Sequence, residues 1–157
     1  MTAEEPEYPA SRSEAALVVT GLLIFIASFL PWYGVDFDGG VAEAGVTGTH
    51  NAWRGLAAAG LLLILFSVVL TVASPLFGED VPRRMPAVFA AVLACVGAAL
   101  VVARSIDLPG LDIPGATASL RWGGWVLVVL VVVHMMISVL RVVHIPQPAS
   151  ARSRSRT

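Results

Sequence analysis

The sequence predicts an all-α fold, an integral membrane four-helix bundle. Four stretches of the chain are apolar over about 20 residues, the helix length that crosses a hydrocarbon core about 30 Å thick. Of the 157 residues, 57% are hydrophobic and 13% are charged, whereas soluble domains carry about 25% charged residues. Little chain remains outside these stretches, so we expect no separate soluble domain with its own core.

Each predicted segment follows from the apolar stretches and their polar boundaries. The expected spans are residues 15–35, 53–76, 86–104 and 122–143. They are connected by an outer loop (36–52), an inner loop (77–85) and a second outer loop (105–121), between tails at 1–14 and 144–157. We expect the first tail, which is polar and contains proline, to be disordered. The last tail alternates arginine with serine.

The first span is predicted to be a retained helix and not a signal peptide. Four glutamates precede its apolar run, against the single Arg12, whereas a secretory signal begins with a basic region. The span also ends in Leu30-Pro31-Trp32-Tyr33, where a signal peptide would have a cleavage site of small residues.

The third and fourth spans differ in the size of their side chains. Small residues at helical spacing in the third span predict a surface that another helix approaches closely. They are Ala87, Ala90, Ala91, Ala94, Gly97 and Ala98. We expect this helix at the centre of the bundle, or at a surface for self-association or for other membrane proteins. The fourth span is rich in Val and Leu nearly all round, and we expect residues such as Leu127 to face lipid.

The distribution of arginines predicts that both termini are cytoplasmic, in a multi-pass protein of the cytoplasmic membrane. With this orientation, seven arginines lie inside and three outside, in agreement with the positive-inside rule. The inner ones are Arg12, Arg83, Arg84, Arg141, Arg152, Arg154 and Arg156, and the outer ones are Arg54, Arg104 and Arg121.

The two outer segments resemble each other. Each carries acidic residues and glycine early, and each ends in arginine, tryptophan and glycine where the next helix begins. One explanation is a duplication of two tandem helical hairpins. The other is that both segments follow the same preferences of the membrane interface.

His134 is the candidate site residue within a span. An ionisable residue at mid-membrane is a functional hypothesis by default, for example as a proton relay. A packing histidine that bonds a neighbouring helix is the alternative, and we favour it because the predicted spans 53–76, 86–104 and 122–143 and the apolar core of the first contain no carboxylate.

A second candidate site is an outer-face cluster of opposite charges. It comprises Arg54, Arg104, Asp36, Asp38, Asp107 and Asp112. A solvated rim is the favoured interpretation, and a small binding site between the outer loops is the alternative.

Other functional classes lack support in the sequence. The single cysteine, Cys95, excludes an internal disulfide, and no His or Cys spacing typical of a metal site is present. No nucleophile–base pair or phosphate loop predicts an enzyme. We therefore expect no catalytic residue, no cofactor and no nucleic-acid partner, and we expect membrane lipids as the surroundings.

Two short motifs resemble those of small four-span actinobacterial membrane proteins of unknown function. The first is the exit Leu30-Pro31-Trp32-Tyr33, and the second is the entry Ala52-Trp53 into the next helix. The resemblance implies architecture and location in the envelope, and no catalytic residues. Together these observations predict a non-enzymatic accessory or scaffold subunit of the cell envelope. The alternative is a small oligomeric transporter or channel with His134 near its pathway.

Overall fold

A computed structural model describes residues 12–37, 51–53, 55–77, 84–108 and 116–144. Its elements are α1 (Arg12–Ala27), β1 (Tyr33–Phe37), α2 (Gly55–Ala73), the 3₁₀ helix η2 (Ser74–Phe77), α3 (Arg84–Ile106), β2 (Ala116–Leu120) and α4 (Trp122–His144). The described residues are mostly helical, which confirms the predicted helical class in outline. Gly55–Leu76, Arg84–Ile106 and Trp122–His144 are each long and apolar enough to cross a membrane.

The first helix is shorter than predicted. α1 has 16 residues and ends at Ala27, whereas the first span was expected to continue to residue 35. Backbone hydrogen bonds continue the helical turns as far as Leu30, whose N–H donates to the Ala27 carbonyl over 3.0 Å. Pro31 follows, and helices usually end at or before the residue that precedes a proline.

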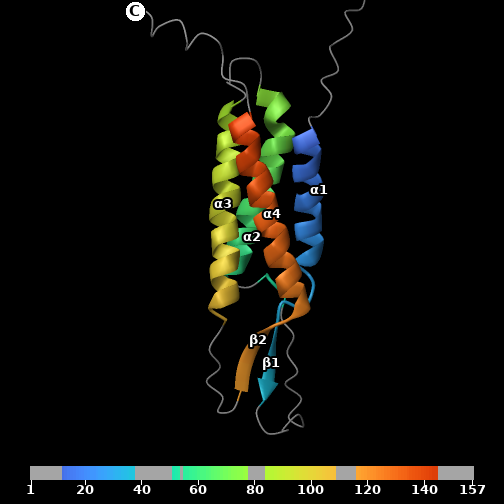
Figure 1. Ribbon diagram of the computed structural model, residues 1–157, viewed down its shortest axis with the longest axis vertical. Helices are drawn as coiled ribbons and strands as arrows, with labels where there is room; N and C mark the ends of the chain where they lie inside the picture. Colours follow the sequence, from blue (N-terminus) through green and yellow to red (C-terminus); the bar gives the residue numbers. More distant parts are fainter. Residues whose placement is uncertain (1–11, 38–50, 54, 78–83, 109–115, 145–157) are drawn as a thin grey trace, which may run out of the picture.

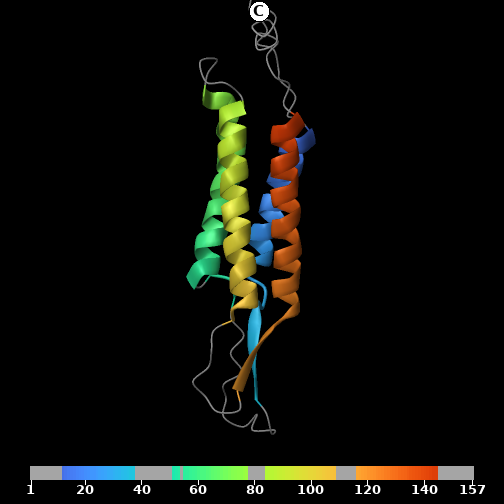
Figure 2. The ribbon, with the colours of Figure 1, turned by 60° about the vertical axis from the view of Figure 1, so that its left-hand side comes forward.

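The four helices lie side by side and alternate in direction (Figure 1). α1 begins and α4 ends at one end of the bundle, which we name the terminal end, and the strands lie at the opposite strand end. Each helix packs against the next along the chain and α4 packs against α1, so the order around the bundle is α1–α2–α3–α4. Figure 2 shows the α2–α3 pair beside the α1–α4 pair.

Small residues bring α2 and α3 into backbone contact. A Cβ added to Gly60 would lie 2.6 Å from the Gly97 carbonyl oxygen, and one added to Gly97 would lie 2.6 Å from the Gly60 carbonyl oxygen. The predicted small-residue face of α3 is buried along the helix, including Ala87, Ala94 and Ala98. This face therefore lies inside the bundle, and the outer face of α3 carries bulky residues.

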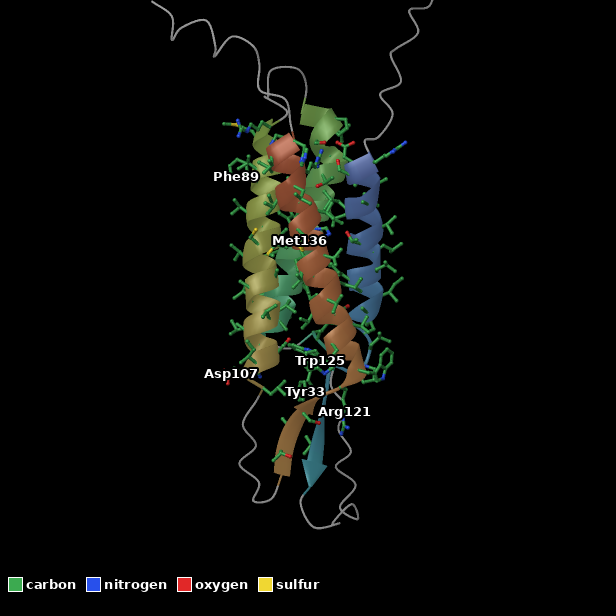
Figure 3. All side chains as sticks on the ribbon, viewed as in Figure 1. Tyr33, Phe89, Asp107, Arg121, Trp125 and Met136 are labelled. Carbon is green, nitrogen blue, oxygen red and sulfur yellow. The ribbon has the colours of Figure 1, made fainter. Side chains whose placement is uncertain are left out.

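One expectation for α4 is wrong. Leu127 is 1% exposed and belongs to the apolar core with Ile24, Leu61 and Val131, so it does not face lipid. The rest of α4 is apolar nearly all round, but its polar residues His134 and Ser138 lie seven and eleven residues after Leu127, on the same helical face, and this spacing marks that face as inward. Met136, labelled in Figure 3, lies on the exposed side of α4.

The strand pair was not predicted, because its residues were assigned to the end of the first span and to the outer loops. β1 and β2 pair antiparallel, from Tyr33 opposite Leu120 to Phe37 opposite Ala116. The two segments that suggested a duplication thus contribute one strand each to the same sheet. The pair is joined closely to the bundle, since the single residue Arg121 separates the end of β2 from the start of α4.

Two glycines at the start of α4 allow the segment after α1 to pack closely against α4. A Cβ on Gly123 would lie 2.5 Å from the Pro31 carbonyl oxygen, and one on Gly124 would lie 2.5 Å from Cδ1 of Trp32. The Arg121 N–H donates to the Trp32 carbonyl over 2.8 Å, which continues the strand pairing by one step. Trp32 is 1% exposed and closes the apolar core at the strand end.

Candidate functional site: a buried histidine shared by three helices

The structure places His134 in the core, with hydrogen bonds to two other helices. Its side chain is 1% exposed. Nδ1 lies 2.8 Å from Oγ1 of Thr20 on α1, and Nε2 lies 3.2 Å from Oγ of Ser67 on α2. The ring therefore bridges α1 and α2 from α4, and both of its nitrogens are satisfied.

The donors and acceptors at this site follow from the contacts of Ser67 and from the chemistry of a neutral imidazole. A neutral imidazole has one donor and one acceptor nitrogen. Ser67 Oγ lies 2.7 Å from the Ile64 carbonyl oxygen, closer than to the ring, so its proton points to that carbonyl and Nε2–H donates to Ser67. With its proton on Nε2, the neutral ring can only accept a hydrogen bond at Nδ1, so the Thr20 hydroxyl donates to Nδ1. Thr20 Oγ1 lies 2.8 Å from Nδ1 and also 2.8 Å from the Ala16 carbonyl oxygen.

These assignments define a directed chain of hydrogen bonds with a closed end. It runs from the Thr20 hydroxyl through the imidazole to Ser67 and stops at the carbonyl of Ile64. A backbone carbonyl accepts a hydrogen bond but has no proton to pass on. The geometry therefore suits a polar tie between helices better than a proton path.

The core around His134 changes character along the bundle. One helical turn nearer the terminal end, Thr71 and Ser138 are buried, and each donates to a carbonyl of its own helix. At that end Arg141 of α4 donates to Glu14 of α1 over 2.5 Å. Towards the strand end the core is apolar apart from Ser28 and Nε1 of Trp32, so most of the buried polar side chains of the described residues lie between the level of His134 and the terminal end.

The outer-face charge cluster is described only in part. Arg54, Asp38 and Asp112 lie outside the described residues, and Asp36 is described only as the position of β1 opposite Thr117. Arg104 donates to the backbone carbonyl of Asp107 over 2.8 Å, and Asp107 is exposed (Figure 3). Within the described residues, Arg104 thus bonds the C-terminal end of its own helix.

The residues of the two short motifs hold the strand end together. Trp53 donates through Nε1 to Oγ of Ser28 over 2.9 Å, and the Ala52 N–H donates to the Ser28 carbonyl over 3.2 Å. Trp53 also packs edge-on against Phe25. These bonds fasten the start of α2 to the end of α1, so the Ala52-Trp53 motif has a structural role.

Sequence reasoning found His134 and missed its partners. Thr20 and Ser67 lie on different helices, far from His134 in the chain, so no local spacing connects the three. The available signal was their similar depth, because each is a polar residue near the middle of an apolar stretch.

The site offers no ligand set for a metal. Within the described ranges, no three His, Cys, Asp or Glu side chains converge. Cys95 is a free, half-buried thiol on α3. No family model, curated protein or solved structure matches this chain.

Proposed function

We propose that this chain is a four-span protein of the cytoplasmic membrane that serves as a non-enzymatic accessory or scaffold subunit. The exposed surface supports membrane insertion. Phe89, Val129 and Leu62, on three different helices, are 61%, 60% and 58% exposed. Soluble monomers rarely expose large contiguous apolar patches, whereas a bilayer solvates them.

The positions of the charges support the same environment. On α3 no charged residue lies between Arg84 and Arg104, a separation of about 30 Å at 1.5 Å per residue. On α4 none lies between its start at Trp122 and Arg141. In the first helix the uncharged residues 15–30 cover about 23 Å on the same scale, and a bilayer can thin locally around a shorter apolar stretch.

The proposed orientation has the terminal end in the cytoplasm. Single cysteines at Gly40 and Glu79, in a Cys95→Ala background, should react differently with a membrane-impermeant maleimide on intact cells. Gly40→Cys should be labelled and Glu79→Cys should not, because the arginine bias places residues 36–52 outside. Labelling of Glu79→Cys alone would reverse the orientation, and equal labelling after cell lysis serves as the control.

The closed hydrogen-bond chain at His134 is the observation that supports a scaffold over a transporter. Each ring nitrogen is occupied by a hydroxyl from a neighbouring helix, and the chain stops at a backbone carbonyl. An ionisable residue that lines a pathway normally faces water or pairs with another ionisable group. His134 does neither among the described residues.

A scaffold subunit should remain with its partners when it is extracted gently. We expect the full chain, crosslinked in native membranes and purified in mild detergent, to yield a defined membrane protein in stoichiometric amount. A matched variant with bulky polar substitutions on the outward face, Val129→Gln and Val133→Gln, should keep its fold and lose the partner. Recovery of the chain alone after crosslinking would contradict the proposal.

A second candidate is a small oligomeric transporter or channel with His134 near its pathway. It is favoured by the buried hydroxyls of Thr71 and Ser138, which lie between His134 and the terminal end. A proton-coupled flux into liposomes that His134→Gln abolishes, with the fold intact, would establish this function in place of the scaffold.

We also infer kinship with the small four-span actinobacterial membrane proteins from the two motifs. The packing of Trp32 on Gly124 and the bond from Trp53 to Ser28 supply a physical reason for both motifs. Other chains with the same arrangement would need the same residues.

A further inference from the structure

One exposed face of α3 combines a cation with apolar side chains. Arg84 is the first residue of the helix and is exposed. Met85, Phe89 and Val92 follow on the outer face and are 56%, 61% and 54% exposed. Phe89 points away from the bundle near the terminal end in Figure 3. The charge of Arg84 therefore lies at the terminal end of a row of exposed apolar side chains.

Nothing described at this end neutralises the charge of Arg84. Glu14 is the one acidic residue that the described ranges place at the terminal end, and it bonds Arg141. The position also opposes the helix dipole, since the N-terminus of a helix carries partial positive charge and favours acids. Among the described residues, Arg84 makes no ion pair.

We propose that this face of α3 binds an anionic phospholipid. The guanidinium of Arg84 holds the negatively charged headgroup, and an acyl chain lies along Met85, Phe89 and Val92. The inference rests on the proposed membrane insertion and adds a partner to it. Anionic lipid attracts each arginine near the surface by about 1 kcal/mol, which corresponds to about a fivefold preference over a zwitterionic lipid.

The test uses the full chain reconstituted in vesicles of phosphatidylcholine with one tenth phosphatidylglycerol. The protein is released with its bound lipids, and the ratio of the two lipids is measured by mass spectrometry. Retained phosphatidylglycerol should exceed its bulk share about fivefold for the unchanged chain and return towards that share for Arg84→Gln. Arg104→Gln, at the other end of the same helix, is the matched control and should keep the enrichment, because the Arg104 guanidinium is already engaged by the backbone carbonyl of Asp107.

A separate variant tests the acyl-chain contact. Phe89→Ala should lower the amount of both lipids retained without changing their ratio. Soluble glycerophosphate should not displace the lipid, which separates a lipid site from a site for free phosphate.

Three results would overturn the proposal: unchanged enrichment in Arg84→Gln, an equal loss in Arg104→Gln, or displacement by glycerophosphate. Unchanged lipid retention in Phe89→Ala would overturn the acyl-chain contact. Resistance to alkaline extraction tests membrane insertion independently. A chain that resists extraction but shows no enrichment would contradict the lipid site alone.

Discussion

Replacing Gly97 with leucine is expected to lower the free energy of unfolding of the bundle by about 1–3 kcal/mol, the usual cost of overpacking. Even the first added carbon would lie 2.6 Å from the Gly60 carbonyl oxygen and 2.7 Å from Cγ1 of Ile64. The first of these neighbours is backbone, which cannot move aside as the end of a side chain can, so α2 and α3 must separate. The midpoint of helix loss in a sodium dodecyl sulfate titration, followed by circular dichroism, measures the effect.

The matched control is Ala99→Leu, two residues along the same helix. Ala99 is exposed on the outer face, so the same side chain placed there meets lipid or detergent and should change the midpoint little. A similar loss for both variants would show that bulk anywhere on α3 is harmful and that the Gly60–Gly97 contact has no special role.

The helices and the packing face of α3 could be predicted from the sequence because both signals are local. Apolar length sets the span, and the repeat of alanines with Gly97 marks one side of a helix. In a bilayer the inside and the outside of a bundle are both apolar, however, so hydrophobicity does not separate them. Leu127 shows this limit, since its hydrophobicity did not mark it as buried, and only its seven-residue spacing from the polar His134 places it on the inner face.

The strands and the bonds of His134 could not be predicted because both depend on long-range contacts. Tyr33 pairs with Leu120, which lies beyond α2 and α3 in the chain. Likewise, Thr20 and Ser67 meet His134 from two other helices. The sequence shows that these residues are polar and lie within apolar stretches. It does not show which of them lie at the same depth in the bundle and can contact one another.

Truncating His134 to alanine is expected to lower the free energy of unfolding by about 2–4 kcal/mol. The larger part is the cavity left by a buried ring, and the smaller part is the loss of two interhelical bonds at about 0.6 kcal/mol each. His134→Gln should cost less than about 1 kcal/mol, since its amide can bond a hydroxyl and fills much of the space. Steric-trapping measurements of unfolding in detergent compare the variants.

A double-mutant cycle then separates the bond from the cavity. Thr20→Val alone should cost about 0.6–1.7 kcal/mol, and it should cost almost nothing when His134 is already alanine, because the bonded partner is gone. Thr71→Val is the control, since its hydroxyl bonds the Ser67 carbonyl of its own helix and its effect should add to that of His134→Ala. Additive effects at Thr20 would mean that the imidazole and the hydroxyl do not interact, and the polar tie between α1 and α4 would then be excluded. Coupling at Thr20 without coupling at Thr71 would show that the bond between His134 and Thr20 itself stabilises the contact between α1 and α4.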